Sequence, residues 1–351
     1  MPIAATSPPL NLALQGGGAH GAFTWGVLDG LLEAGYSHFE GVSGTSAGAM
    51  NAVCLAHGLM QGGADGARAA LAGFWTAVAG SSPFETNGDG STLSPALRLM
   101  LQWTDYLSPE QMNPLDLNPL RDILAEQIDF AGLRAHSPVK LFIAATHANS
   151  GKLRIFRSPE ISLEALLASA CLPTIHRSIV IDGEPYWDGG YSANPAVFPL
   201  VHECAAADIL LVLLTPLRYE ATPESAPDIK LRLRELAFNA TFLREMRMFA
   251  HLQEQVRHGA PSSDRPGWFD RLLGRRPQPR GLEARLSALR FHAISADQAL
   301  HALPAESKLA VSLPFFERLR DDGRAHARSW LEKHRSILGK AATLDLGSLF
   351  Y

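Results

Sequence analysis

The chain has 351 residues, of which 46% are hydrophobic and 19% are charged, and its formal net charge is −4. This composition is typical of a globular protein with a sizeable core, formed by one large domain or by one domain with an appended cap. The near balance of charge gives no basis for a nucleic-acid partner. Residues 1–9 lack the basic and apolar regions of a secretory signal. No stretch approaches the roughly 18 apolar residues of a membrane span, so we expect a cytoplasmic protein.

Three cysteines are spread along the chain, Cys54, Cys171 and Cys204, each among apolar neighbours. An odd and widely spaced set does not indicate a disulfide framework. The pattern predicts buried free thiols in a reducing compartment, and neither a metal nor a cofactor is expected.

The first structural unit is a strand at residues 10–15 that ends in three consecutive glycines, Gly16, Gly17 and Gly18. Glycine permits backbone conformations that a side chain would forbid, so the chain can turn sharply here. Apolar residues at helical spacing follow over 22–33. A helix that begins just after a glycine turn directs free N–H groups and the positive end of its dipole toward the turn. The sequence therefore predicts an anion site.

The next unit repeats this order with a serine in the turn. A short strand ends at residues 41–43, and a helix follows the segment from Gly44 to Gly48, which has Ser46 at its centre. This G-x-S-x-G pattern is typical of a nucleophile elbow, where the serine occupies a strained strand-to-helix turn with its hydroxyl exposed. The alternative is a structural tight turn, and the pattern alone is weak in a chain with 30 glycines. The flanking strand and helix and the upstream anion site favour the nucleophile.

Further elements follow in chain order. Periodicity predicts helices over 62–80, 120–128 and 162–171 and strands over 139–146, 152–156 and 208–214. The strand at 208–214 is a continuous apolar run of the kind buried between helical layers in a parallel sheet. A polar loop is expected over 81–90. Aromatic residues and prolines are mixed over 93–118, which either lines an acyl-chain pocket above the sheet or forms a packed surface layer.

A hairpin is predicted where Asp182 and Gly183 separate two apolar arms. The returning arm delivers Asp188 into a loop with Gly189 and Gly190, where no neighbouring side chain shields its carboxylate. That carboxylate is a candidate base for a serine. Taken alone, Asp-Gly-Gly is more often an ordinary turn.

The 13 histidines also offer candidate bases, so their number decides nothing. His147 lies just beyond the strand at 139–146, and a polar strand end is the commoner meaning of such a residue. His176 lies on the segment that leads to the hairpin and is the best candidate if a triad exists. His20 follows the glycine turn and is a candidate for orienting or polarising the anion site.

The composition changes after residue 215. A long basic amphipathic helix is predicted over 229–258, and residues 259–290 are rich in Pro, Gly and Arg, with seven Arg against three acidic residues. Within that segment, aromatic and leucine pairs alternate with Arg, and a short helix of this pattern suits an anionic bilayer surface. We expect a peripheral contact with the inner face of the membrane through 263–278, with a disordered loop as the alternative.

The last elements are an edge strand over 289–294 and a helix over 315–338. The apolar positions of this helix predict docking on the core or on a second subunit, which would make a homodimer.

Three motifs in this order resemble those of the patatin-like phospholipases. They are Gly16-Gly17-Gly18-Ala19-His20-Gly21, Gly44-Thr45-Ser46-Ala47-Gly48 and Asp188-Gly189-Gly190. The resemblance spans roughly residues 10–215, and three ordered motifs are far more specific than one. It implies an α/β fold with three layers, α/β/α, around a mostly parallel central sheet. It also implies a catalytic domain over 1–220 and a helical extension over 221–351 packed on the core.

The resemblance further implies a lipid acyl hydrolase that cleaves carboxylic esters of phospholipids or related acyl lipids. Ser46 would be the nucleophile and Asp188 the proton acceptor, with no histidine required. The oxyanion hole would be formed by the backbone of four residues, Gly16, Gly17, Gly18 and Ala19. The other motif residues would support these turns: His20, Gly21, Gly44, Gly48, Gly189 and Gly190.

One departure from the family concerns His20, where the family usually has Arg or Lys. The function of that cation is therefore carried out by imidazole here, or not at all. A carboxylate with an ordinary pKa near 4 is a weak base for a hydroxyl, so Asp188 must be partly desolvated to raise its pKa.

Two other functions fit parts of the sequence. A G-x-G-x-x-G run from Gly16 to Gly21, with Glu40 about 20 residues beyond, also fits a dinucleotide-binding Rossmann-type fingerprint. That assignment leaves Ser46 and Asp188 without a role. A catalytically silent membrane-binding homologue would keep the fold, but the intact serine and aspartate argue against it.

Overall fold

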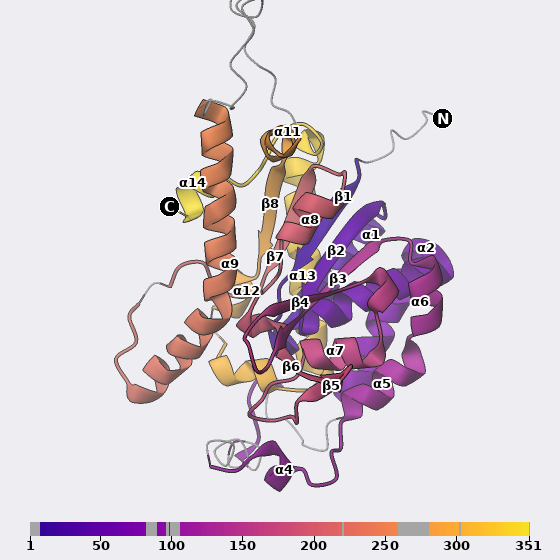
Figure 1. Ribbon diagram of the computed structural model, residues 1–351, viewed down its shortest axis with the longest axis vertical. Coiled ribbons are helices and arrows are strands. Elements are labelled where there is room, and N and C mark those ends of the chain that lie inside the picture. The colour runs from indigo at the N-terminus through magenta and orange to yellow at the C-terminus, as the bar shows by residue number, and fades with distance from the viewer. Residues whose placement is uncertain are drawn as a thin grey trace, which may run out of the picture.

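The computed structural model of the protein describes residues 8–81, 90–95, 98, 106–219, 221–258, 281–301 and 303–350. Within these residues the centre is one eight-stranded sheet, shown in Figure 1. The strands are β1 (Leu10–Leu14), β2 (Phe39–Thr45), β3 (Lys140–His147), β4 (Leu153–Arg157), β5 (Ile179–Ile181), β6 (Glu184–Asp188), β7 (Asp208–Leu213) and β8 (Arg290–Ser295).

The strand order is β5-β6-β3-β2-β1-β7-β8, and β4 pairs with β3 beside this path. The pairs β1–β2, β1–β7, β2–β3 and β7–β8 are parallel. The other pairs, β3–β4, β3–β6 and β5–β6, are antiparallel. The sheet is thus mostly parallel with β8 as an edge strand, and both predictions are confirmed.

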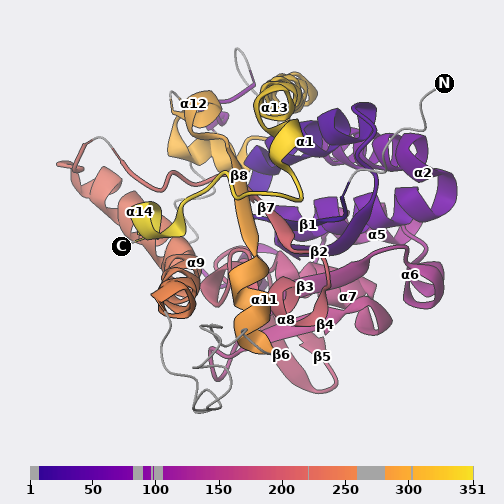
Figure 2. The ribbon, with the colours of Figure 1, turned by 90° about the horizontal axis from the view of Figure 1, so that it is seen from above.

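Helices cover both faces of the sheet because parallel strands need crossover connections. Figure 2 shows the resulting three layers, with α1 (Gly21–Glu33), α2 (Ala47–Gly80) and α13 (Leu313–His334) on one face. The opposite face carries α8 (Phe198–Glu203), α9 (Ala226–His258) and α11 (Leu282–Ala288). The other helices described are η1 (Gly18–His20), α4 (Pro109–Met112), α5 (Pro119–Gln127), α6 (Phe130–His136), η2 (Ser158–Glu160), α7 (Leu163–Ser169), η3 (Gly189–Tyr191), α12 (Asp297–Leu300), η4 (Ala305–Leu309), η5 (Arg335–Ile337) and α14 (Leu346–Phe350).

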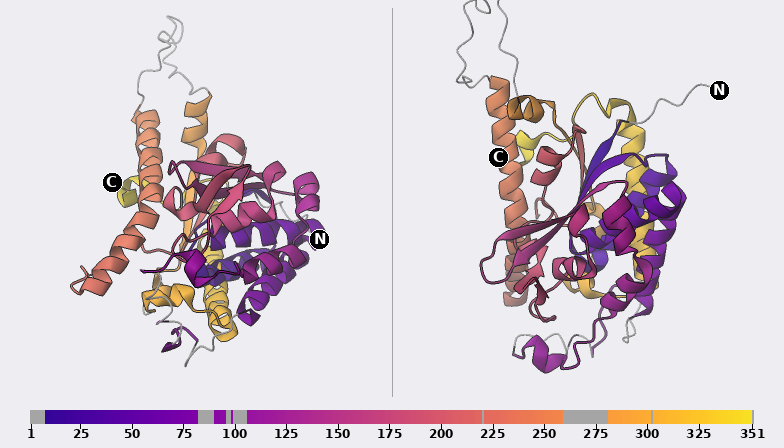
Figure 3. Two further views of the ribbon diagram at one scale, coloured as in Figure 1. Left: turned by 60° about the horizontal axis from the view of Figure 1, so that its bottom comes forward. Right: turned by 45° about the vertical axis from the view of Figure 1, so that its right-hand side comes forward.

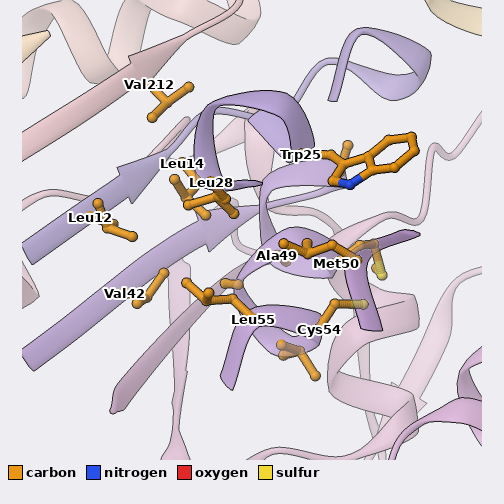
Figure 4. Packing of buried hydrophobic residues seen from close by; sticks show 14 of the residues in the cluster. Leu12, Leu14, Trp25, Leu28, Val42, Ala49, Met50, Cys54, Leu55 and Val212 are labelled. Carbon is orange, nitrogen blue, oxygen red and sulfur yellow. The ribbon is translucent and has the colours of Figure 1, made fainter. Parts of the chain in front are cut away.

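Alternation along the central strands builds two hydrophobic cores. Leu12 and Leu14 of β1 belong to the cluster formed with α1, α2 and α13, whereas Ala13 belongs to the cluster with α8 and α9. Side chains on a strand point alternately to its two faces, so one strand serves both cores. Figure 4 shows the first core, where Leu28 and Leu55 lie close to these leucines. The three cysteines are free and buried, as predicted.

The final long helix, α13, packs on α1 of the same chain through small residues. Gly26 on α1 lies against the backbone of α13, and Gly323 on α13 lies against the backbone of α1. Phe315 and Leu319 of α13 are fully buried in the first core. The sequence left two docking sites open for this helix, the core of the same chain and a second subunit. In the structure the helix docks on the core.

The helix expected over 62–80 is present as the second of two helical segments in α2. α2 spans Ala47–Gly80, and its helical geometry is broken at Gly62 and Gly63. Gly63 has φ 61°, a left-handed conformation that glycine adopts without steric cost, so two helical segments meet at this kink.

The apolar side chains over 93–118 differ in burial where the structure describes them. Leu93 is buried in the first core, whereas Tyr106, Leu115 and Leu117 are 81%, 77% and 68% exposed, so these three do not belong to a packed layer. The side chain of Asn113 accepts the N–H of Leu117 at 3.0 Å and donates to its carbonyl oxygen at 2.8 Å. This polar turn holds the two leucines outward.

Two expectations concern segments outside the described residues, namely most of the polar loop at 81–90 and the membrane segment at 263–278. Among the helices that are described, none combines the length and the apolar content needed to cross a bilayer.

Candidate active site

Ser46 occupies the turn between β2 and α2, where the G-x-S-x-G pattern predicted it. Its φ is 55° and its ψ is −124°, a conformation that residues with a side chain rarely adopt. The turn is tight, since a Cβ on Gly44 would lie 2.5 Å from the carbonyl oxygen of Gly48. The N–H of Ser46 donates to Ser169 Oγ at 3.0 Å. Ser46 itself is half-buried, so the strained turn leaves the residue partly accessible.

Strand register places Asp188 beside Ser46. In the parallel pair β2–β3, Thr45 lies opposite Ala144. β2 ends at Thr45, so the chain leaves the sheet at Ser46. The next position along β3, Ala145, pairs with Asp188 at the end of the antiparallel strand β6. The end of β6 therefore lies next to the point where β2 ends, and Asp188, the last residue of β6, comes beside the turn that holds Ser46. The Ser46 side chain lies close enough to the Asp188 carboxylate to lower its pKa.

Asp188 is buried, with 1% of the residue exposed. Its Oδ1 accepts the N–H of Gly190 at 2.7 Å, and its own carbonyl oxygen and N–H bond Thr146 Oγ1 and the Cys171 carbonyl, each at 2.8 Å. Burial raises the pKa of Asp188 from 3.8 to about 7, although the hydrogen bonds from Gly190 and Ser46 oppose the rise. The desolvated carboxylate that a serine base requires is therefore present.

The glycine turn after β1 lies against the serine turn. A Cβ on Gly16 would be 2.8 Å from Ser46 Cβ, so only glycine permits this approach. Gly18 has φ 59°, which turns the chain into η1. Among the described residues, no acceptor is hydrogen-bonded by the N–H groups of Gly17, Gly18 or Ala19. Free N–H groups at a helix start are suited to an oxyanion.

Two residues that the sequence analysis missed, Asn194 and Gln15, fix this turn. Asn194 Oδ1 accepts the Gly16 N–H at 2.7 Å, so Gly16, unlike the other three residues expected in the oxyanion hole, has its N–H occupied. Gln15 Nε2 donates to the Asn194 carbonyl at 3.2 Å, and its Oε1 accepts the N–H groups of Leu214 and Thr215 at 2.6 and 2.8 Å. The position of Gln15, a polar residue at the end of an apolar strand, could have indicated a structural role. No sequence pattern indicated one for Asn194.

His20 is a buried neutral imidazole. Burial first, and the charge of Lys308 second, lower its pKa from 6.5 to about 3. Its Nε2 lies 2.7 Å from Ser307 Oγ in η4, and its Nδ1 has no partner among the described residues. The imidazole therefore does not replace the cation usual in the family, and it instead connects the glycine turn to the C-terminal segment.

The alternative histidine bases lie elsewhere. His147 Nε2 is 2.7 Å from Glu184 and its Nδ1 is 2.8 Å from Ser150 Oγ, both on the exposed side of the β3–β6 pair. His176 is half-buried in the loop before β5, where desolvation lowers its pKa. Within the described residues, no hydrogen bond joins either histidine to the serine or to the aspartate.

Glu40 is far from any nucleotide that the glycine turn could hold. It is the second residue of β2, at the amino ends of the parallel strands, whereas the glycine turn follows the carboxyl end of β1. Its carboxylate accepts the N–H groups of Ala205 and Ala206 at 2.8 and 2.6 Å and bonds Lys140 Nζ at 3.0 Å. The acidic residue that a dinucleotide fingerprint requires is thus committed to a structural role.

Within the described residues, the other candidate features lie apart from this site. A cavity of about 570 Å³ between α9, β8 and α14 contains none of the motif residues. Among the described residues, no group of three or more His, Cys, Asp and Glu side chains is arranged to hold a metal ion.

A serine in a strained strand-to-helix turn, next to a buried carboxylate and to free backbone N–H groups, defines a site suited to acyl transfer. Residues 12–201, more than half of the chain, match the model of the patatin-like phospholipase family, and the chain belongs to that family. The family supports lipid acyl hydrolysis as the general activity.

Comparison with solved structures identifies the crystal structure of VipD from Legionella pneumophila, at 16% identity and a TM-score of 0.42. The similarity covers 93% of this chain and 67% of that one. No curated protein matches the sequence.

Proposed function

We propose that this protein is a serine esterase of phospholipase A type, which cleaves carboxylic esters of phospholipids or related acyl lipids through a Ser46–Asp188 dyad. One observation carries the proposal: strand register brings a serine held at positive φ beside a buried aspartate whose pKa is raised to about 7. The family membership supports the lipid substrate.

In the proposed mechanism Ser46 Oγ attacks the ester carbonyl while Asp188 accepts its proton. The N–H groups of Gly17, Gly18 and Ala19 stabilise the tetrahedral oxyanion. Removing one such donor typically raises the barrier by about 3 kcal/mol. The alcohol leaves with a proton returned by the aspartic acid, and the aspartate then activates the water that hydrolyses the acyl-enzyme.

The proposal also covers the domain organisation, the location and the assembly of the protein. Residues 1–220 form the catalytic domain, and residues 221–351 form a helical extension packed on it. The protein acts in the cytoplasm, peripheral to the inner membrane face, with 263–278 as a contact segment and a homodimer as the candidate assembly. The His20 imidazole supports the oxyanion turn through Ser307 and carries no charge.

A fluorophosphonate probe with peptide mapping tests the dyad. Ser46→Ala should abolish labelling and ester hydrolysis in a folded protein, and Asp188→Asn should lower turnover by at least about 1,000-fold, because the base is removed. His147→Asn and His176→Asn are the matched controls and should keep most of the turnover. A histidine change as damaging as Asp188→Asn would show that the dyad is misassigned.

A panel of acyl lipids then defines the substrate. Hydrolysis of phospholipid or lysolipid esters that disappears in Ser46→Ala supports the proposal. A folded wild-type chain that neither reacts with the probe nor hydrolyses any ester would instead be a catalytically silent homologue.

A further inference from the structure

Between residues 229 and 248, the exposed positions of α9 carry only apolar and basic side chains, whereas the acidic residues Asp228 and Glu254 are exposed nearer its two ends. We define the α9 outer face as the exposed positions between 229 and 248, which are Ile229, Lys230, Leu233, Arg234, Leu236, Ala237, Ala240, Arg244, Arg247 and Met248. Their spacing of three or four residues places them along one side of the helix. The two acidic residues in this range, Glu235 and Glu245, are not among the exposed positions. The face thus carries a formal charge of +4 on a chain of −4.

Large apolar side chains stand out from this face instead of packing. Leu233 and Met248 are each 63% exposed, Leu236 is 47% and Ile229 is 42%. A row of exposed aliphatic side chains on a soluble surface marks an interaction site.

The inner side of the same helix fixes it next to the proposed dyad. Phe238 packs on Tyr191 with ring centroids 4.6 Å apart, and Tyr191 follows Asp188 by three residues. Glu235 on the inner side binds Lys308 Nζ at 2.9 Å and the Tyr219 hydroxyl at 2.9 Å. The outer face is therefore rigidly placed relative to the catalytic loop.

The first turns of α9 project from the body at the end where the hairpin β5–β6 and α4 also lie, as Figures 1 and 3 show. This end carries the other strongly exposed apolar side chains, Tyr106, Leu115, Leu117 and Val180.

We propose that the α9 outer face docks the protein on an anionic lipid surface and so presents the Ser46–Asp188 site to its substrate; this inference rests on the proposed function. Basic side chains attract anionic headgroups while the interleaved aliphatic side chains enter the interface. A nucleic acid would satisfy the charge but not the aliphatic row. A second copy docked through the same face would oppose like charges, which disfavours a symmetric dimer.

The test is co-sedimentation with phosphatidylcholine vesicles, with and without phosphatidylglycerol, using full-length Ser46→Ala so that no lipid is hydrolysed. The variant R244E/R247E is compared with K333E/K340E, whose lysines are exposed on the opposite side of the sheet. Each of these double variants lowers the formal charge of the chain by 4, from −4 to −8. The apolar arm compares L233Q/L236Q with L349Q, which replaces a leucine that is 45% exposed on α14.

The expected result is binding that requires phosphatidylglycerol and that R244E/R247E weakens by about 30-fold, since each basic side chain near an anionic surface contributes roughly fivefold. K333E/K340E and L349Q should bind as Ser46→Ala does, whereas L233Q/L236Q should bind more weakly. Single changes R244E and L233Q serve if a double variant does not fold.

Three outcomes would overturn the inference: equal binding by R244E/R247E and K333E/K340E, binding unaffected by L233Q/L236Q, or a dimer in light scattering that L233Q/L236Q converts to a monomer, which would show that this face is a dimer interface. Probe labelling of the wild type reports the dyad separately. Vesicle binding without labelling would reject the proposed function and keep the docking face.

Discussion

Asp188 is an acid whose surroundings make it a base of useful strength. General-base catalysis is most effective when the pKa of the base lies near the working pH, and burial brings the pKa of Asp188 from 3.8 to about 7. The hydrogen bonds from Gly190 and Ser46 hold the carboxylate in position while moderating that rise. The same contacts therefore orient the base and set its strength.

This pKa predicts the pH dependence of the reaction. Only ionised Asp188 accepts a proton, so kcat/KM for a soluble short-chain ester should rise with pH through a single limb near pH 7 and fall about tenfold per unit below it. A pH–rate profile of the wild type measures the limb. His20→Asn is the control and should leave its position unchanged, because the pKa of His20 is lowered to about 3. A limb near pH 4 would contradict a desolvated base.

At this scale the sequence motifs predicted Ser46 and Asp188 as the reacting groups, but they did not predict the residues that hold the glycine turn in place. Ser46 and Asp188 each lie in a short motif with glycines that a tight turn requires, so a local pattern marks both residues. Asn194 acts on Gly16 across 178 positions of sequence, and nothing near it signals this contact. Its position depends on how the chain returns beside β1, which periodicity does not specify.

Two helices of the first layer cross unusually closely. On α1, Gly26 and Gly30 are four residues apart, and on α13 Gly323 and Ala327 have the same spacing, so each helix offers a flat stripe to the other. Small residues at a helix crossing let the backbones approach more closely than larger side chains allow.

Adding one methyl group to this crossing should destabilise the protein. Gly323→Ala places a Cβ against the Phe23 carbonyl oxygen, which cannot move without shifting α1, and we expect a loss of about 2 kcal/mol in the free energy of unfolding. Urea denaturation measures it. Gly80→Ala on α2 is the control, because a Cβ there meets nothing within 4 Å, and it should leave stability unchanged or slightly raised. Equal stability of both variants would mean that the crossing is looser.

Element prediction succeeded where one periodicity dominates. The alternation and apolar runs gave the strands from β1 to β8, and the Asp182–Gly183 turn gave the hairpin, with φ values of 54° and 83°. Composition did not predict that Leu115 and Leu117 are exposed, because an apolar residue on a polar turn contributes to composition in the same way as one in a core. Their outward placement is set by the hydrogen bonds of a single asparagine.

At the level of the whole molecule, the segment after residue 220 completes both the sheet and the first core. β8 pairs with β7 along its full length, and α13 covers α1. η4 reaches the glycine turn itself, where the Lys308 carbonyl abuts Gly18 and Ser307 bonds His20. Sequence periodicity gave the helices of this extension but not these contacts, because they join positions nearly 300 residues apart.

A chain truncated after residue 220 should therefore fail to form a working site. It would expose the apolar side of α1 and the unpaired edge of β7, so we expect aggregation and no fluorophosphonate labelling. Solubility on expression and probe labelling, each compared with the full chain, provide the measurement. A soluble and labelled fragment would show that the extension is dispensable for the site.

Under the proposed function, the contact of η4 with the glycine turn has a consequence for the order in which the site forms during synthesis. A ribosome makes the serine and the aspartate long before it makes the residues that hold the oxyanion turn in place. If the proposed function holds, the growing polypeptide should therefore stay inactive until its last seventh has been made and has packed against the turn.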